Sequence, residues 1–162
     1  MGVIDHESTD TVAVDLEELW RAHGPTALRL ATVLVGPADA HDVTVSAFLR
    51  VTSSPALAEI EVFRSYLLRA IRNEAQSMFR SRLRRRRRDL AAVPERVAKD
   101  PAGDVDLRAA IVGLGLRQRT VLFLAYREDM TEAVVAETLG LSRGTVHRDL
   151  QRARDRLRKA LQ

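Results

Sequence analysis

Apolar residues along this chain recur at steps of three and four, which is the spacing of one face of an α-helix. Near the C-terminus Val146, Leu150, Ala153 and Leu157 follow this spacing, and the residues between them are polar or basic. The same spacing recurs in the earlier segments 16–34, 38–51, 58–78 and 107–125. No stretch alternates apolar and polar residues over the length of a strand. The pattern therefore predicts an all-α protein.

Glycine and proline mark the expected ends of these helices. Gly24-Pro25 is expected to break or kink the first helix, and Gly36-Pro37 to end the second. Residues 89–105 contain prolines and a glycine and few large apolar groups, which is typical of a linker. The sequence thus predicts two small helical domains joined by a flexible linker. Their predicted bounds are 12–88 for the first domain, 89–105 for the linker and 106–162 for the second domain.

The charges are divided unevenly between the two predicted domains. Residues 1–63 hold 3 arginines against 10 acidic residues, whereas residues 64–162 hold 23 basic against 12 acidic residues. Such asymmetry suggests that one part meets a polyanion and another part meets a different partner. Almost all of the basic residues are arginine, whose planar guanidinium group can donate two parallel hydrogen bonds to a phosphate or to a guanine edge. The codon usage of a GC-rich genome would also favour arginine.

Several classes of protein are disfavoured by what the sequence lacks. It has no cysteine, which excludes disulfides and thiolate metal sites, and its four histidines are scattered, so we expect neither a metal nor another cofactor. No run of about 18 apolar residues suggests a membrane span. The acidic N-terminus does not resemble a secretory signal. We expect a cytoplasmic protein.

A helix-turn-helix is predicted between residues 131 and 153. Ala136 is small where two helices must cross closely, Gly140 lies at the tight turn, and Val146 anchors the second helix to the first. Thr131 and Ser142 stand where the two helices should have their N-caps. The second helix of such a motif lies in the DNA major groove. An ordinary helical hairpin with a solvated second helix is the alternative.

The outward face of that second helix follows from placing Val146 in the core. A turn of about 100° per residue then directs a set of polar residues away from the core or to its flanks. These residues are Thr145, His147, Arg148, Gln151 and Arg152. The positive helix end near Ser142 can meet a phosphate.

A long basic helix is predicted before the linker. Aromatic residues at 63, 66 and 79 are interleaved there with arginines and with Asn73. Unpaired bases are bound by aromatic rings that stack and by cations that hold the backbone. Aromatic residues at helical spacing are also common in cores, and we expect Phe63 to be core. Arg84 to Arg88 surround the helix on every side, so part of this run must be solvated, and the rest can clamp phosphates nonspecifically.

Three stretches together resemble the extracytoplasmic-function (ECF) group of bacterial sigma-70-class RNA polymerase sigma factors, and the chain is similar to their SigE-like actinobacterial branch. The stretch GPADAHDVTVSAFLRV resembles their polymerase-binding helix. The stretch FRSYLLRAIRNEAQSMFRSRLRRRRR resembles the helix that reads and opens the −10 promoter element. The stretch LRQRTVLFLAYREDMTEAVVAETLGLSRGTVHRDLQRARDRLRKAL resembles the domain that binds the −35 element. The likeness runs from about residue 16 to residue 161.

The resemblance implies a transcription initiation factor that binds core RNA polymerase, recognises both promoter elements and assists melting, with no enzymatic activity of its own. It implies contacts to the −35 element by Ser142, Arg143, Thr145, His147, Arg148, Gln151 and Arg152. It implies contacts to the −10 element by Tyr66, Arg69, Arg72, Asn73 and Arg80, helped by the loop 52–59. Core polymerase would be bound by Asp39, Asp42, Phe48 and Arg50. An anti-sigma protein is a further expected partner, and the active factor would be associated with the nucleoid.

The chain departs from the family pattern in its polymerase-binding helix. The family usually carries a Gln-Glu pair where this chain has Val45 and Ser46, and Asp149 stands where many relatives have a basic residue. Loss of a polar pair can weaken polymerase binding by a few kcal/mol. Two alternatives therefore stay open. One is a helix-turn-helix regulator that does not engage polymerase, and the other is a sigma-like decoy that sequesters an anti-sigma protein.

Overall fold

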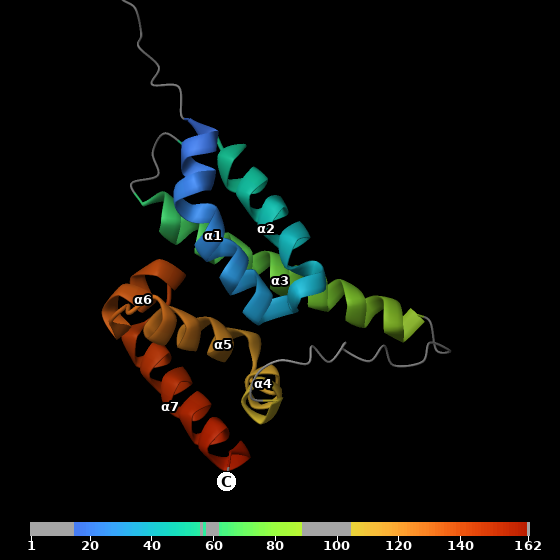
Figure 1. The fold of residues 1–162 in the computed structure, drawn as a ribbon, viewed down its shortest axis with the longest axis vertical. Helices are drawn as coiled ribbons and strands as arrows, with labels where there is room; N and C mark the ends of the chain where they lie inside the picture. The colour runs from blue at the N-terminus through green and yellow to red at the C-terminus, as the bar shows by residue number, and fades with distance from the viewer. Residues whose placement is uncertain (1–14, 56, 58–61, 89–104, 162) are drawn as a thin grey trace, which may run out of the picture.

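The computed structural model describes residues 15–55, 57, 62–88 and 105–161, which form helices and contain no strand (Figure 1). The prediction of an all-α chain is confirmed over these ranges. In the N-terminal half, helices α1 (Leu16–Val35), α2 (Pro37–Thr52) and α3 (Phe63–Arg88) pack against one another. Of the loop 52–59 predicted to help capture the −10 element, residues 56, 58 and 59 lie outside the described residues, and so does the predicted linker up to residue 104.

The C-terminal half consists of shorter helices around one longer helix. Its elements are α4 (Val105–Val112), α5 (Leu116–Leu122), the π-helical turn η2 (Phe123–Arg127), α6 (Glu132–Leu139) and α7 (Arg143–Ala160). Helix α7 contacts α4, α5 and α6 and so forms the spine of this half. Its apolar face contributes Val146, Leu150 and Ala153 to the core, as the spacing predicts.

The predicted break at Gly24-Pro25 is wrong, because α1 runs through it without interruption. Asp15 caps the helix by accepting from the backbone N–H groups of Glu17 (2.9 Å) and Glu18 (3.2 Å). A proline inside a helix removes one backbone hydrogen bond and costs about 3 kcal/mol. Packing offsets this cost, since α1 lies against α2, α3 and α5. Gly24 is buried beneath Trp20, where a Cβ atom would lie 3.1 Å from the indole.

The core of the N-terminal half is aromatic at one end and aliphatic along α3. Phe48 packs edge-on against Trp20 and Phe63, with ring centroids 5.0 and 5.9 Å apart. Leu67 and Ile71 are fully buried on α3. The arginine run at the end of this helix is exposed throughout. All five arginines are thus available to solvent or to a polyanion.

The two halves pack directly against each other. Helix α3 contacts α5 and α6, α1 contacts α5, and one continuous apolar core joins Leu30 and Leu68 to Val121, Leu124 and Leu139. The sequence alone predicted two bodies and gave no sign of this contact. The arrangement matters for function because the contact involves α3, the helix predicted to read the −10 element.

Candidate nucleic-acid interface

The turn between α6 and α7 has the geometry of a helix-turn-helix. The Thr131 hydroxyl accepts from the Val134 N–H (3.3 Å) at the start of α6. Helix α6 ends at Leu139 and is capped by Gly140, whose φ of 63° and ψ of 39° are left-handed and favour glycine. Helix α7 then begins at Arg143 and is capped by Ser142, whose hydroxyl accepts from the Thr145 N–H (3.1 Å). Both predicted N-caps and the predicted glycine turn are confirmed.

Burial divides α7 into a packed face and an outer face. Val146 is fully buried and Leu150 is nearly so. The residues predicted to contact the −35 element all lie on this helix or at its N-cap. Those that are exposed are Ser142, Arg143, His147, Arg148, Gln151 and Arg152, whereas Thr145 is half-buried. The structure therefore brings the predicted set together on one basic surface.

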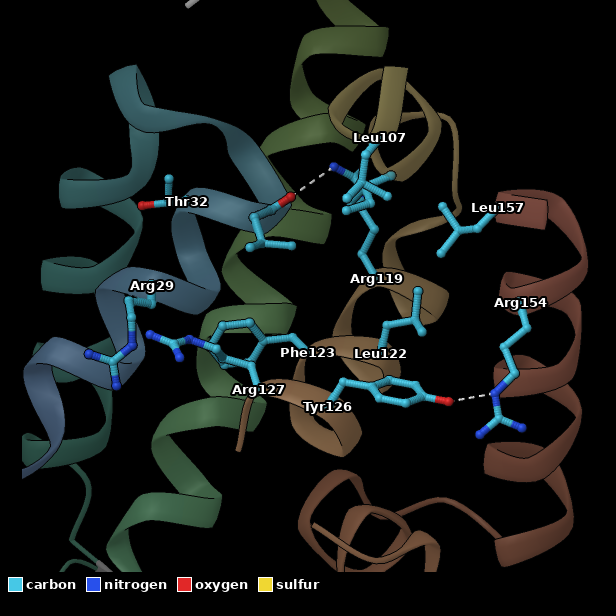
Figure 2. Close-up of a pocket in the computed structure, with 12 residues that line it drawn as sticks. Arg29, Thr32, Leu107, Arg119, Leu122, Phe123, Tyr126, Arg127, Arg154 and Leu157 are labelled. Atoms are coloured by element: carbon cyan, nitrogen blue, oxygen red, sulfur yellow. Dashed lines mark hydrogen bonds between the residues drawn. The ribbon is translucent and has the colours of Figure 1, made fainter. Parts of the chain in front are cut away.

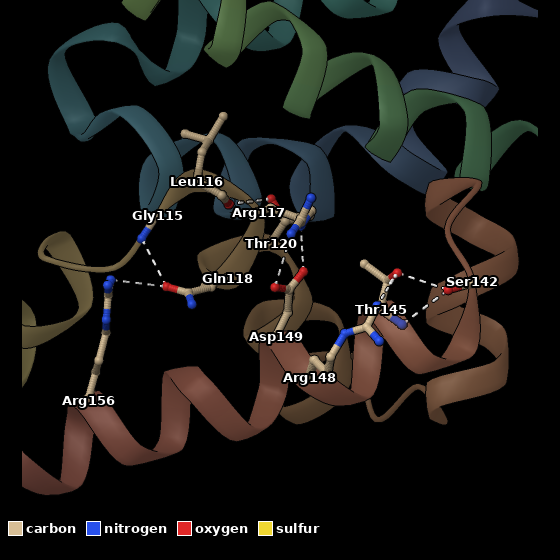
Figure 3. A network of polar contacts seen from close by, with 10 residues as sticks. All are labelled: Gly115, Leu116, Arg117, Gln118, Thr120, Ser142, Thr145, Arg148, Asp149 and Arg156. Atoms are coloured by element: carbon tan, nitrogen blue, oxygen red, sulfur yellow. Dashed lines mark hydrogen bonds and ion pairs between the residues drawn. The ribbon is translucent and has the colours of Figure 1, made fainter.

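Short polar contacts hold several of these side chains in place (Figure 3). The hydroxyls of Ser142 and Thr145 are 2.8 Å apart, and Arg148 donates to the Thr145 hydroxyl (3.3 Å). His147 Nδ1 lies 3.1 Å from a carboxylate oxygen of Glu132 at the start of α6. Fixed side chains lose less conformational entropy when they bind DNA, so this part of the surface is partly preorganised.

The Asp149 side chain is buried against α5 and does not face the solvent. It is 2% exposed and accepts two hydrogen bonds from the Arg117 guanidinium of α5, one of them at 3.2 Å (Figure 3). These contacts raise the pKa of Arg117 above its usual range. Sequence reasoning noted Asp149 only as a departure from the family and missed Arg117. The spacing of Asp149 from Val146, Leu150 and Ala153 was the signal, because it puts the carboxylate on the buried face.

The residues predicted to read the −10 element lie along α3 but differ in exposure. Tyr66, Asn73 and Arg80 are exposed, with Tyr66 at 48%. Arg69 and Arg72 are half-buried, and Arg69 donates to the Thr138 carbonyl of α6. Burial, together with the nearby cations Arg69 and Arg117, lowers the pKa of the Arg72 guanidinium. This face of α3 is therefore only partly accessible in the present arrangement.

Two of the four residues predicted to bind polymerase, Asp39 and Asp42, line a groove of about 370 Å³ between α2 and α3. Asp39 pairs with Arg82 of α3 at 2.7 Å, and the exposed Arg50 pairs with Glu74. Asp42 and Ser46 line the groove. Phe48 must be corrected as a contact residue, since its 8% exposure places it in the core. Its ring packs against Trp20 and Phe63.

Two further observations bear on the kind of site. The parts of the chain that the structure describes contain no group of three or more His, Asp or Glu side chains arranged to hold a metal ion. Within the same ranges, no helix combines the length and apolar character that crossing a bilayer requires. A capped turn, a buried anchor and a basic outer face define a helix-turn-helix protein.

Comparison with known proteins shows which family of helix-turn-helix proteins this chain resembles. Residues 19–88 match sigma-70 region 2, and residues 104–157 match sigma-70 region 4. The chain is 31% identical to the ECF RNA polymerase sigma factor SigE of Mycolicibacterium smegmatis, over 99% of this chain and 66% of that protein. It is 30% identical to the RNA polymerase sigma-E factor of Streptomyces coelicolor, over 91% of this chain and 86% of that one.

Two solved structures share the fold. One is the sigma factor RpoE from Bartonella quintana in complex with the anti-sigma factor NepR, with a TM-score of 0.76 and 24% identity over 91% of this chain and 96% of that one. The other is CnrH in complex with the cytosolic domain of CnrY, with a TM-score of 0.64 and 23% identity over 90% of this chain and 86% of that one. The protein belongs to the sigma-70 family of RNA polymerase sigma factors, in its extracytoplasmic-function group. This family consists of non-catalytic transcription factors.

Proposed function

We propose that this chain is an alternative sigma factor that directs core RNA polymerase to promoters, reads their −35 and −10 elements, and assists melting. One observation carries the proposal most directly. The predicted −35 residues form a single basic surface on α7, opposite the buried Val146 and Leu150. Basic groups at the N-terminal turns of a recognition helix contact phosphates and base edges in the major groove.

The proposed −10 function belongs to α3. Tyr66 offers an exposed ring for stacking, and Asn73 and Arg80 are exposed further along the same helix. Extruding a base costs a few kcal/mol, which stacking at about 1–3 kcal/mol per base and phosphate contacts can offset. A Tyr66→Ala variant should therefore lose transcription on duplex promoters and regain it on a template that is already unpaired at the −10 element. Failure of the premelted template to rescue this variant would argue against a melting role.

The proposed polymerase contact lies along α2. Asp39 and Asp42 remain acidic, but Val45 and Ser46 replace the polar pair that the family usually carries. Ser46 is exposed and lines the groove beside Glu74, so a longer polar side chain can be accommodated there. Restoring the pair as Val45→Gln with Ser46→Glu should raise affinity for core polymerase. An unchanged affinity would mean that this chain binds polymerase through other contacts.

Run-off transcription tests the whole proposal. Purified core polymerase with the full chain should give discrete transcripts from genomic DNA fragments, and core polymerase alone should not. Absence of transcripts, together with no affinity for core polymerase at low salt, would favour the regulator that binds DNA without polymerase. Binding to an anti-sigma protein without any promoter binding would favour the decoy.

We further propose that an anti-sigma protein regulates this chain and that it works in the cytoplasm, associated with the nucleoid when active. One of the two structural neighbours above was solved with the anti-sigma factor NepR, and the other with the cytosolic domain of CnrY, which supports a protein partner of this kind here. The location follows from the proposed role, because polymerase and promoter DNA are found there. Co-purification of the tagged chain from its own cells tests for such a partner.

A further inference from the structure

Two arginines in the C-terminal part of α7 are held by neighbouring elements. Arg154 donates from Nε to the Tyr126 hydroxyl of η2 (2.6 Å), as Figure 2 shows. Arg156 donates to the side-chain oxygen of Gln118 in α5 (3.4 Å; Figure 3). These contacts leave base edges to the N-terminal turns of α7, which is also the part of a recognition helix that enters the major groove.

His147 lies in the second of these turns and is oriented by another helix. Its side chain is 56% exposed, and its Nδ1 atom lies 3.1 and 3.3 Å from the two carboxylate oxygens of Glu132. Glu132 is the first residue of α6 and directly follows the N-cap Thr131. The positive end of α6 stabilises this carboxylate in its charged form.

The carboxylate determines which ring nitrogen of His147 carries the hydrogen. A charged carboxylate only accepts hydrogen bonds, so Nδ1 must be the donor and must carry the hydrogen. In the neutral ring Nε2 then has no hydrogen and is an acceptor. No group in the described part of the chain hydrogen-bonds to Nε2. The outer face of α7 therefore presents a histidine whose free nitrogen can accept a hydrogen bond from DNA.

An acceptor at this place selects one class of base. In the major groove adenine N6 and cytosine N4 are amino groups that donate, whereas guanine O6 and thymine O4 are carbonyl oxygens that accept. An accepting Nε2 matches the amino bases, and a carbonyl base would bring two acceptors together. Arg148, the next residue, has the opposite preference because a guanidinium only donates. Two adjacent side chains of α7 thus suit different classes of base.

We propose that His147, held by Glu132, reads an amino base, adenine or cytosine, at one position of the −35 element. The inference rests on the proposed function and refines it from a basic surface to a rule for one base. Glu132 is a positioning residue, which acts through the tautomer of the ring and not through a DNA contact of its own. The rule groups adenine with cytosine, a grouping that neither the size of the base nor the strength of its pair produces.

Binding to single-base variants of a −35 duplex tests the rule. The full chain, alone and with core polymerase, selects a duplex from a random library at about pH 8.5, where histidine is neutral. Each position of that duplex is then changed to the other three bases. At one position adenine and cytosine should bind about tenfold more tightly than guanine and thymine, as expected for one hydrogen bond gained and one unpaired acceptor avoided.

Two histidine variants locate the contact. His147→Ala should bind all four bases alike at that position. His41→Ala removes an exposed histidine of α2 and should keep the preference.

A base analogue removes the amino group alone. Nebularine is adenine without the N6 amino group, and in place of adenine at the same position it should weaken wild-type binding by about tenfold. It should leave binding by His147→Ala unchanged. The weaker base pair of nebularine affects both proteins equally, so the difference between them reports the contact with His147.

Glu132→Gln tests the positioning role. A glutamine amide donates as well as accepts, so both tautomers of His147 become available. This variant should bind amino and carbonyl bases within about twofold of one another. Glu137→Gln removes the same charge from an exposed position of α6 and should keep the tenfold preference. A gain in affinity that is equal for all bases and for both variants is the effect of charge alone.

Each outcome decides a separate point. A selected duplex without a position that groups adenine with cytosine would overturn the role of His147, as would a preference that survives His147→Ala or nebularine bound as tightly as adenine. An unchanged preference in Glu132→Gln would overturn the role of Glu132. Selection of no duplex, with or without polymerase, would overturn the proposed function itself.

Discussion

The buried pair of Asp149 and Arg117 makes a quantitative prediction about the recognition helix. Asp149 is held in the core of the C-terminal half, whereas the Arg117 side chain is 52% exposed. Replacing Asp149 by Asn keeps the shape and one acceptor oxygen but removes the charge. Breaking a wholly buried ion pair costs about 3–5 kcal/mol. Because the released Arg117 can return to water, we expect a smaller loss of about 2 kcal/mol.

Replacing Arg117 should cost more stability than replacing Asp149. Arg117→Gln leaves the Asp149 carboxylate buried without its donor, so we expect a loss of about 3 kcal/mol in the free energy of unfolding. The double variant should cost less than the sum of the two single changes, with a coupling of about 1–2 kcal/mol. Unequal losses from the two single variants, together with this coupling, are expected for an ion pair in which one partner is buried and the other is half-exposed.

Urea unfolding followed by far-UV circular dichroism at pH 7 measures these differences. Coincident transitions by tryptophan fluorescence would justify the two-state treatment. Arg158→Gln is the matched control, because Arg158 is an exposed arginine of α7 far along the helix from the pair. Additive losses from the two single variants, or an Asp149→Asn variant as stable as wild type, would refute the idea that this pair fixes α7 to α5.

Three further predictions concern DNA binding, the turn and pH. Arg148→Ala should weaken binding to a −35 element by about 1–3 kcal/mol in a titration at fixed salt, whereas Arg158→Ala should change it little. Gly140→Ala should lower the melting temperature, with a loss of about 1–2 kcal/mol, because it places a side chain at φ 63° and against Arg69; an unchanged melting temperature would contradict this. Burial, helped by the nearby cation of Arg64, lowers the pKa of His23 below its usual 6.5. The unfolded chain then binds that proton more readily, so stability should fall as pH drops from 7.5 to 5.5, and His23→Gln should flatten this dependence in urea titrations.

Much of the fold could be predicted because it depends on local signals. Helical spacing placed α2, α3 and α7, and the residues at 131, 140 and 142 marked the ends of α6 and α7 through the backbone conformations that they favour. The outer face of α7 could be predicted for the same reason, since one buried residue on a helix fixes the direction of its neighbours. Local rules failed at Pro25, where packing of α1 on three other helices outweighs the cost of the proline.

The sequence by itself therefore determined the helical class, the two halves, and a basic recognition helix, because these follow from periodicity and capping within a few residues. Only the tertiary structure decided which groups these side chains meet: Arg117 for Asp149, Trp20 for Phe48, and the Thr138 carbonyl of the other half for Arg69. Each of these depends on a partner between 28 and 69 positions away in the chain. No spacing rule relates residues so far apart, since their proximity exists only after the helices have packed.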